Sequence, residues 1–255
     1  MKKKLWIVAL LWLGINSFFL VRWVRAHYIV PVLMYHEIDA RDTQGSKLVV
    51  SPESFRRQME FLKLTGAKVT PMEEVVEAFH SGDSLHSRTV VLTFDDGFEN
   101  FYTNAFPTLQ THHLPAVVFV VTGWVGKNGY LTWEQIRQLD QEGITIGSHS
   151  VTHPWLPALS DVELKRELQA SKRILEGKLG HPVDLFCYPM GAFDERVRKA
   201  VIDAGYRGAR ATNPGKAASN RDPYALKRVR ISRSSDSLLT FWVESSGYYL
   251  GFKEK

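Results

Sequence analysis

Two adjacent carboxylates follow an apolar run near the middle of the chain. Residues 89–94 read Thr-Val-Val-Leu-Thr-Phe, typical of a strand buried on both faces, and Asp95, Asp96 and Gly97 come next. Neighbouring side chains on a strand point to opposite faces, so a buried strand cannot hold both acids and they must lie where it ends. Such a pair repels unless a cation lies close. An Asp-Gly turn would explain Asp96 and Gly97 but not the paired acids, so we expect a metal or acid–base site.

A histidine pair is the second candidate for chemistry. His149-Ser-Val-Thr-His153 follows the short apolar stretch 144–148. Both imidazoles can reach one ion if the segment turns after the strand, and Pro154 indicates a turn within a loop. The pair alone is weak evidence, because most histidines are surface residues or satisfied core residues. Two imidazoles with one carboxylate, however, leave open positions for water, as hydrolytic metal sites need.

The surrounding pattern alternates strands and helices. We expect strands at 29–35, 89–94, 116–121, 144–148, 183–188, 206–211 and 226–231, and helices at 51–64, 70–80, 99–112, 132–143, 160–179, 194–204 and 238–244. This alternation predicts an α/β fold with a parallel sheet covered on both sides, and seven or eight units favour a barrel over an open sheet. His36, the aspartates, His149 and Tyr188 all follow strand ends, so one face of the fold should carry them.

The first 26 residues are set apart by composition. Three lysines precede an apolar run from Leu5 to Val21, and Arg22 and Arg25 follow it. The run exceeds the usual core of a secretory signal, about 7–15 residues, and nearly reaches the span of about 20 that crosses a bilayer. A cleaved signal peptide and an uncleaved anchor both remain open. We favour an anchor with its lysines inside and one catalytic domain, residues 27–255, outside the cytoplasm.

This segment also explains the net charge. The chain has a formal charge of +5, and residues 1–26 contribute five basic groups and no acid. The remaining domain is formally neutral, which argues for membrane targeting rather than nucleic-acid binding. Cys187 is the only cysteine, so no disulfide can form within the chain.

Three motifs carry a family resemblance. Thr93-Phe-Asp-Asp-Gly97, His149-Ser-Val-Thr-His153 and Phe186-Cys-Tyr-Pro-Met-Gly191 resemble motifs of the polysaccharide deacetylases of the NodB-homology group, carbohydrate esterase family four. The resemblance covers about Val30 to Ile231. It implies a deformed (β/α) barrel and metal-dependent removal of acetyl groups from N-acetylated sugars.

The same resemblance assigns roles to residues. By position, Asp95 would be the general base, and Asp96, His149 and His153 would hold one divalent metal. The backbone N–H of Met190 would stabilise the oxyanion. Zinc is the metal expected first, but two histidines and a carboxylate also suit iron, cobalt or nickel.

Two departures from the family pattern stand out. Cys187 occupies the position of an arginine that steadies the catalytic aspartate, and the C-terminal region has no Leu-x-His motif. Instead, Pro31-Val-Leu-Met-Tyr-His36 resembles the exopolysaccharide-type branch, in which the catalytic histidine comes early by circular permutation. His36 is therefore the expected catalytic acid, with a buried core histidine as the alternative. Arg228 is a candidate for the missing cation, with a solvated strand end as the alternative.

Sugar contacts are expected at the third motif and at tryptophans. Tyr188 and Pro189 follow a strand end, and Trp155 follows the histidine pair. Trp124 and Trp133 are further candidates, although tryptophans more often pack helices than bind sugars.

The leading hypothesis is a monomeric, membrane-tethered enzyme that deacetylates N-acetylglucosamine residues of an exopolysaccharide or of peptidoglycan. One alternative is another single-metal hydrolase such as a phosphoesterase, which should show an arginine–lysine cluster or a second metal. The other is a non-catalytic carbohydrate-binding protein at the cell surface. The presence of Asp95 and His149 argues against that reading.

Overall fold

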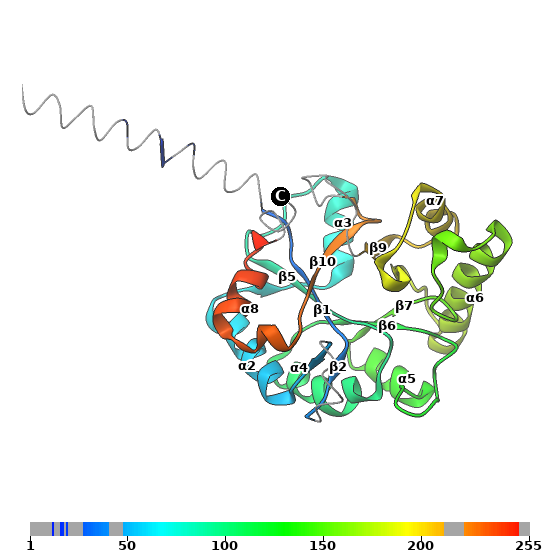
Figure 1. Cartoon of the computed structure of the whole chain (residues 1–255), viewed down its shortest axis with the longest axis horizontal. Helices are drawn as coiled ribbons and strands as arrows, with labels where there is room; N and C mark the ends of the chain where they lie inside the picture. Colours follow the sequence, from blue (N-terminus) through cyan, green and yellow to red (C-terminus); the bar gives the residue numbers. More distant parts are fainter. Residues whose placement is uncertain are drawn as a thin grey trace, which may run out of the picture.

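Seven parallel strands close into a barrel in the computed structural model (Figure 1). The structure describes residues 12, 16, 17, 19, 28–40, 48–211 and 222–249. The barrel strands are β1 (Val32–Tyr35), β5 (Thr89–Phe94), β6 (Val117–Val120), β7 (Thr145–Ser148), β8 (Leu185–Cys187), β9 (Gly208–Ala211) and β10 (Leu226–Arg230). Closure is made by β1, which pairs with β5 on one side and with β10 on the other. The predicted α/β barrel is confirmed, with seven strands.

Three short strands lie outside the barrel. β4 (Lys68–Val69) pairs with β5, while β2 (Glu37–Ile38) and β3 (Val49–Val50) form a separate parallel pair. β2 begins one residue after His36, so the chain leaves the barrel directly after that side chain.

Helices surround the barrel (Figure 1). They are α2 (Pro52–Leu64), α3 (Met72–Ser81), α4 (Phe106–His112), α5 (Trp133–Gln141), α6 (Asp161–Leu179), α7 (Glu195–Asp203) and α8 (Leu238–Ser245). A π-helical turn, Phe101–Ala105, leads into α4. Capping boxes start α5 at Thr132 and α6 at Ser160, and Gly180 ends α6 at φ 82°.

An aromatic cluster fixes the end of β1 against β5. Tyr35 stacks on Phe94 at 5.2 Å between ring centroids, and Phe55 of α2 contacts both rings edge-on at 5.3 and 5.7 Å. All three are at most 1% exposed. Full burial of a Phe-sized side chain contributes about 1.5–3 kcal/mol, so this cluster holds the two strand ends firmly together.

Strand register then places the next residues. Tyr35 is paired with Phe94, and the Asp95 N–H donates to the Tyr35 carbonyl at 3.0 Å. His36 and Asp95 therefore leave the barrel side by side. On the other side of the site, Cys187 of β8 is paired with Arg210 of β9.

The predicted anchor falls mostly outside the described residues, as do residues 41–47 of the loop after β2. In the part of the chain that the structure describes, no helix has both the length and the apolar character needed to cross a membrane. The division into residues 1–26 and 27–255 stays a prediction.

Candidate metal and catalytic site

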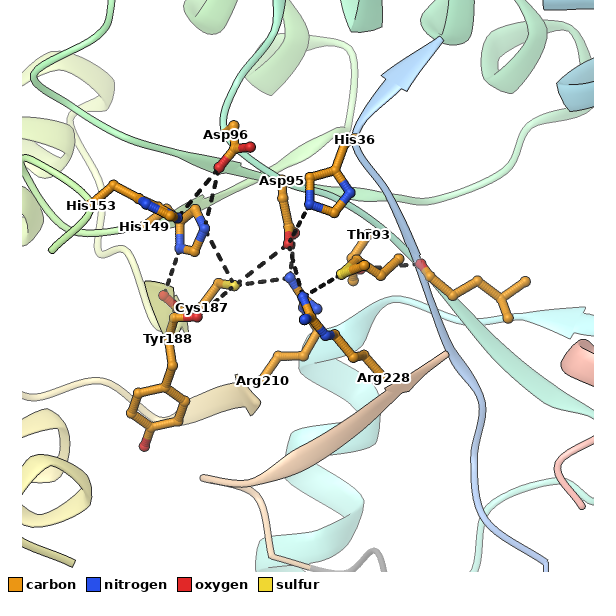
Figure 2. Close-up of polar contacts among 12 residues, drawn as sticks. His36, Thr93, Asp95, Asp96, His149, His153, Cys187, Tyr188, Arg210 and Arg228 are labelled. Carbon is orange, nitrogen blue, oxygen red and sulfur yellow. Dashed lines mark hydrogen bonds and ion pairs between the residues drawn. The ribbon is translucent and has the colours of Figure 1, made fainter. Parts of the chain in front are cut away.

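The carboxyl ends of the barrel strands gather eight polar side chains in one cluster (Figure 2). They come from β1, β5, β7, β8, β9 and β10, and are His36, Asp95, Asp96, His149, His153, Cys187, Arg210 and Arg228. Six of these residues were expected at or beside the site as acid, base, ligands or cation, and Cys187 was noted only as a departure from the family motif. Arg210 was not anticipated.

Asp96, His149 and His153 form a candidate metal triad. One oxygen, Asp96 Oδ1, lies 3.5 Å from His149 Nε2 and 3.7 Å from His153 Nε2. Three such ligand atoms lie within 4.8 Å of one another. Ligands about 2.1 Å from a tetrahedral zinc ion are themselves roughly 3.4 Å apart. The three residues therefore fit one ion with little movement.

The backbone of β8 orients the first histidine. His149 Nδ1 lies 2.7 Å from the carbonyl oxygen of Cys187, a contact in which the ring donates its Nδ1–H. This leaves the Nε2 lone pair directed at Asp96. Burial lowers the pKa of His149 to about 3, so the ring is neutral at pH 7, as a metal ligand must be.

The negative charge of Asp96 is only partly compensated by Arg210 and Arg228. Burial and the neighbouring charge of Asp95 raise the pKa of Asp96 to about 7, and its backbone is left-handed at φ 72°. A cation held between this carboxylate and the two histidines would relieve the repulsion. The electrostatics of the site thus agree with its geometry.

The loop that carries His153 is held by a glutamate from α6. The Glu167 carboxylate accepts the N–H groups of Val151 and Thr152 at 2.8 and 3.0 Å and the Thr152 hydroxyl at 2.9 Å. Ser150 Oγ accepts the His153 N–H at 3.0 Å, and both Ser150 and His153 have positive φ. The predicted loop turn is present, but its clamp, Glu167, was not predicted.

Asp95 is paired with a buried arginine from β9. Asp95 is 2% exposed and Arg210 is fully buried, and the Arg210 guanidinium donates to Asp95 Oδ1. Burial alone would raise the pKa of Asp95. The positive charge of Arg210 is the main cause that holds that pKa well below its usual range, and the charge of Arg228 adds to it. Asp95 therefore stays ionised at neutral pH, whereas Asp96 titrates near pH 7, and such a split separates the roles of two carboxylates.

The expected cation, Arg228, does lie within ion-pair distance of Asp95, but Arg210 lies closer. Arg228 Nη1 is 3.8 Å from Asp95 Oδ2 and so is a second neighbour, whereas Arg210 makes the direct contact. Arg210 Nη2 also lies 2.9 Å from Cys187 Sγ, because the two residues are partners in the β8–β9 register. The arginine expected on β8 is thus replaced by one on the adjacent strand, with the small Cys187 leaving it room. In the sequence, the only sign that Arg210 could be this cation was its position as the one arginine among the small residues of β9.

His36 faces the same carboxylate from the β1 side. Its Nε2 lies 3.9 Å from Asp95 Oδ2, and its side chain is 12% exposed. Burial lowers the pKa of His36 to about 4, although Asp95 opposes this shift, so the ring is neutral at pH 7. Its buried Nδ1 has no hydrogen-bond partner among the described residues. A core histidine is normally satisfied by hydrogen bonds, so this geometry favours a functional role.

The third motif divides into an exposed and a buried part. Met190 is left-handed at φ 55° and is 49% exposed. Tyr188, by contrast, is fully buried, stacks on Phe193 at 4.6 Å and donates its hydroxyl to the Tyr224 carbonyl at 3.1 Å. Its ring points away from the cluster (Figure 2), and Pro189 is also buried. The burial of Tyr188 and Pro189 therefore contradicts the expectation that these two side chains contact sugar.

The three candidate tryptophans differ in exposure and in their contacts. Trp155 is 52% exposed and stays a candidate for sugar contact. Trp124 lies 5.4 Å from the His153 ring and 5.1 Å from the Tyr130 ring, which is itself stacked on Phe98 at 5.2 Å. Trp133, at the start of α5, packs against the core and lies under Lys178.

Replacing Arg210 tests the buried pair. Arg210→Met should lower the free energy of unfolding by about 3–5 kcal/mol, because it leaves Asp95 as an uncompensated buried charge. The pKa of Asp95 should also rise, so the acid limb of any activity profile should move to higher pH. Arg210→Lys, which keeps the charge, is the matched control and should shift both quantities less. Urea denaturation and a pH series measure them, and an unchanged acid limb in Arg210→Met would show that Arg210 does not tune Asp95.

Comparison with known proteins places this site in a family. Residues 82–209 match the polysaccharide deacetylase family. The chain is 30% identical over 217 residues to the Bacillus subtilis protein YxkH, whose name places it among the polysaccharide deacetylases, covering 85% of this chain and 76% of YxkH. It is 24% identical to a poly-β-1,6-N-acetyl-D-glucosamine N-deacetylase of Staphylococcus epidermidis, covering 82% of each.

A solved structure agrees in fold. The Streptococcus pyogenes deacetylase PplD, determined in complex with acetate, superposes with a TM-score of 0.76 at 29% identity, covering 83% of this chain and 97% of PplD. The family match contains Asp95, Asp96, His149 and His153 and ends one residue before Arg210. The chain is a polysaccharide deacetylase and belongs to carbohydrate esterase family four.

Proposed function

We propose that this protein hydrolyses the acetamido groups of N-acetylglucosamine residues in an exopolysaccharide of the poly-β-1,6-linked type. The observation that carries the proposal is the position of the ionised Asp95 beside the candidate triad Asp96, His149 and His153. The names of several relatives, including the Staphylococcus epidermidis enzyme, support this substrate class.

Asp96, His149 and His153 would hold one divalent ion, with zinc the first candidate. When bound, such an ion would supply Lewis-acid activation of water and of the acetyl carbonyl. Neutral imidazoles and a carboxylate are suitable ligands for this ion. Because both imidazoles are neutral at pH 7, metal binding does not have to displace a proton from their ligating nitrogens.

The chain's own groups would then move the protons. Asp95, kept ionised by Arg210, accepts a proton from the attacking water, and the neutral His36, whose Nε2 faces Asp95, takes up that proton and passes it to the departing amine. The backbone N–H of Met190 would donate to the oxyanion. Water and the amide are consumed, and acetate and a glucosamine residue are formed.

An aromatic and acidic pocket adjoins the site and supports binding of a polymer. It has a volume of about 570 Å³ and is lined by Glu37, Phe98, Asn100 and Tyr130, among others. The row of rings from His153 through Trp124 and Tyr130 to Phe98 leads into it. Aromatic faces pack well against the apolar faces of sugar rings. Neighbouring sugars of the polymer would lie along this row, with Trp155 at the exposed side.

The phosphoesterase alternative lacks support. Among the described residues, a second possible ligand set, Asp95 with His149 and Cys187, shares His149 with the first and so does not make an independent second metal site. Arg210 is fully buried and engaged by Asp95, so it cannot clamp a phosphate.

The proposal includes location and assembly. Residues 1–26 would anchor the protein in the cell membrane with the domain outside the cytoplasm, and the domain would act as a monomer. The apolar run from Leu5 to Val21 behind three lysines supports the anchor.

The test is acetate release from a panel of acetylated polymers. Poly-β-1,6-N-acetylglucosamine oligomers, chitin oligomers and peptidoglycan fragments are compared with and without a chelator, and metal content is measured in parallel. We expect chelator-sensitive acetate release, fastest on the β-1,6-linked oligomers. Release from none of the polymers by metal-loaded protein would contradict the proposal, and faster release from peptidoglycan would change the substrate.

His36→Ala should separate proton transfer from metal binding. Since His36 is not a candidate ligand, this variant should keep its fold and metal but lose about 10²–10⁴-fold in turnover. His86→Ala, which removes an exposed surface histidine, is the matched control. Near-wild-type acetate release by His36→Ala would make His36 a structural residue and refute the permuted catalytic histidine.

A further inference from the structure

Helix α8 exposes an apolar stripe. Leu239, Trp242 and Val243 are 70%, 53% and 41% exposed, while Phe241 and Glu244 of the same helix are buried at 0% and 5%. The three exposed residues follow the three- and four-residue spacing of one helix face. The helix thus directs a tryptophan and a leucine to the outside and a carboxylate to the inside, which marks the outer face as a contact surface.

The end of the stripe formed by Trp242 and Val243 lies near the barrel end opposite the active site, beside Tyr28 and Arg88. The Ile29 N–H, just before β1, donates to the carbonyl of Gly247, two residues after α8, at 2.8 Å. His36 and the rest of the cluster follow the other ends of the strands. The exposed face of α8 and the reaction centre therefore point in different directions.

A groove continues the stripe. It has a volume of about 620 Å³, and its walls include Tyr28, Arg88, Trp242, Val243 and Tyr248. Tyr28 contacts Tyr248 edge-on at 5.8 Å. Among the described residues that line the groove there is one arginine and no carboxylate. Aromatic rings and a cation around an apolar surface match the composition found where proteins meet lipid headgroups.

The chain itself leads from this groove to an apolar segment. Tyr28 forms part of the wall, and six residues separate it from Val21, the end of the apolar run. Even fully extended, the chain from Val21 to Tyr28 spans at most about 25 Å. If the run is anchored in a bilayer, the groove wall at Tyr28 is held within that distance of the lipid surface, with Trp242 and Val243 in the same groove.

We propose that the α8 stripe and this groove rest on the bilayer, with Leu239, Trp242 and Val243 in the headgroup region and the active site facing away from the membrane. The inference rests on the proposed anchoring of residues 1–26. It deepens that proposal by fixing the orientation of the domain, so that polymer reaches the site from outside rather than from the membrane surface.

Site-directed labelling of the full chain in vesicles tests the orientation. Leu239→Cys and Trp242→Cys would each carry an environment-sensitive fluorophore, since the natural Cys187 is 1% exposed and protected from label. The vesicles would contain phosphatidylcholine and phosphatidylglycerol, with a quencher on some lipid chains. We expect a blue shift and lipid quenching at both positions. Val162→Cys on α6, which replaces another apolar side chain, 80% exposed, is the matched control and should show neither.

The outcomes separate the anchor from the orientation. If the protein does not float with vesicles, both are overturned. If it floats but the labels at 239 and 242 stay as hydrated as that at 162, only the orientation is overturned. If the labels are already shielded before vesicles are added, a second copy or another segment of the chain covers the stripe. This result also overturns the proposed orientation. Leu239→Asp with Trp242→Asp should lose the lipid contact of α8 yet keep acetate release from soluble oligomers.

Discussion

Replacing His153 by alanine is expected to remove most of the bound metal and to reduce acetate release to background. His153 Nε2 is one of three candidate ligand atoms, and its ring shares Asp96 Oδ1 with His149. Loss of a residue that merely orients a ligand typically costs 10–100-fold in metal affinity, so loss of a ligand should cost more than about 100-fold. Metal analysis after dialysis and the acetate assay measure the two effects.

Glu167→Gln provides a graded comparison. Glu167 holds the His153 loop through three hydrogen bonds but contributes no candidate ligand atom. Its amide can keep some of these contacts, so metal affinity should fall by roughly 10–100-fold, between wild type and His153→Ala. Circular dichroism checks that both variants are folded. Full metal retention in His153→Ala would refute the assignment of the triad.

Asp95→Asn is expected to reduce turnover strongly without removing the metal. The amide carries no charge and cannot take a proton from water, so turnover should fall by about 10²–10⁴-fold. Metal content should stay close to that of wild type, because Asp95 is not in the triad. Near-normal acetate release would show that another group accepts the proton.

The same substitution should also change stability, with a definite pH dependence. Arg210 would lose its buried partner, which costs about 3–5 kcal/mol. The pKa of Asp95 is depressed in the folded protein, so the pair stabilises wild type fully above the unfolded pKa of about 3.9, and this stabilisation is lost as pH falls below it. The gap in unfolding free energy between wild type and Asp95→Asn should therefore narrow below about pH 4. The double variant Asp95→Asn with Arg210→Met, which leaves neither charge buried, should recover part of the stability at neutral pH.

The sequence alone located the chemistry at strand ends. Two adjacent aspartates cannot both follow the inward face of a buried strand, and the period of a strand is a local property that needs no knowledge of the fold. The same local reasoning placed a loop turn between His149 and His153, and capping residues placed α5 and α6. The family motifs and the barrel also followed from the sequence, because they depend on spacing along the chain.

The sequence could predict that the barrel closes, but not the register in which the strands pair. The first and last strands of any closed barrel are neighbours, so His36 could be expected near the site. The structure adds that β1 lies between β10 and β5 and that Tyr35 is paired with Phe94. This pairing brings His36 to Asp95.

Only the tertiary structure decided which groups surround the site residues. Arg210 meets Asp95 because β8 and β9 are aligned with Cys187 opposite Arg210, and Glu167 reaches the histidine loop because α6 packs across it. Tyr188 enters the core rather than the sugar site for a similar reason, since Phe193 and the Tyr224 carbonyl satisfy its ring and hydroxyl. Each of these contacts joins side chains on different elements. Register and packing between elements depend on the whole set of buried contacts, which no local pattern of residues encodes.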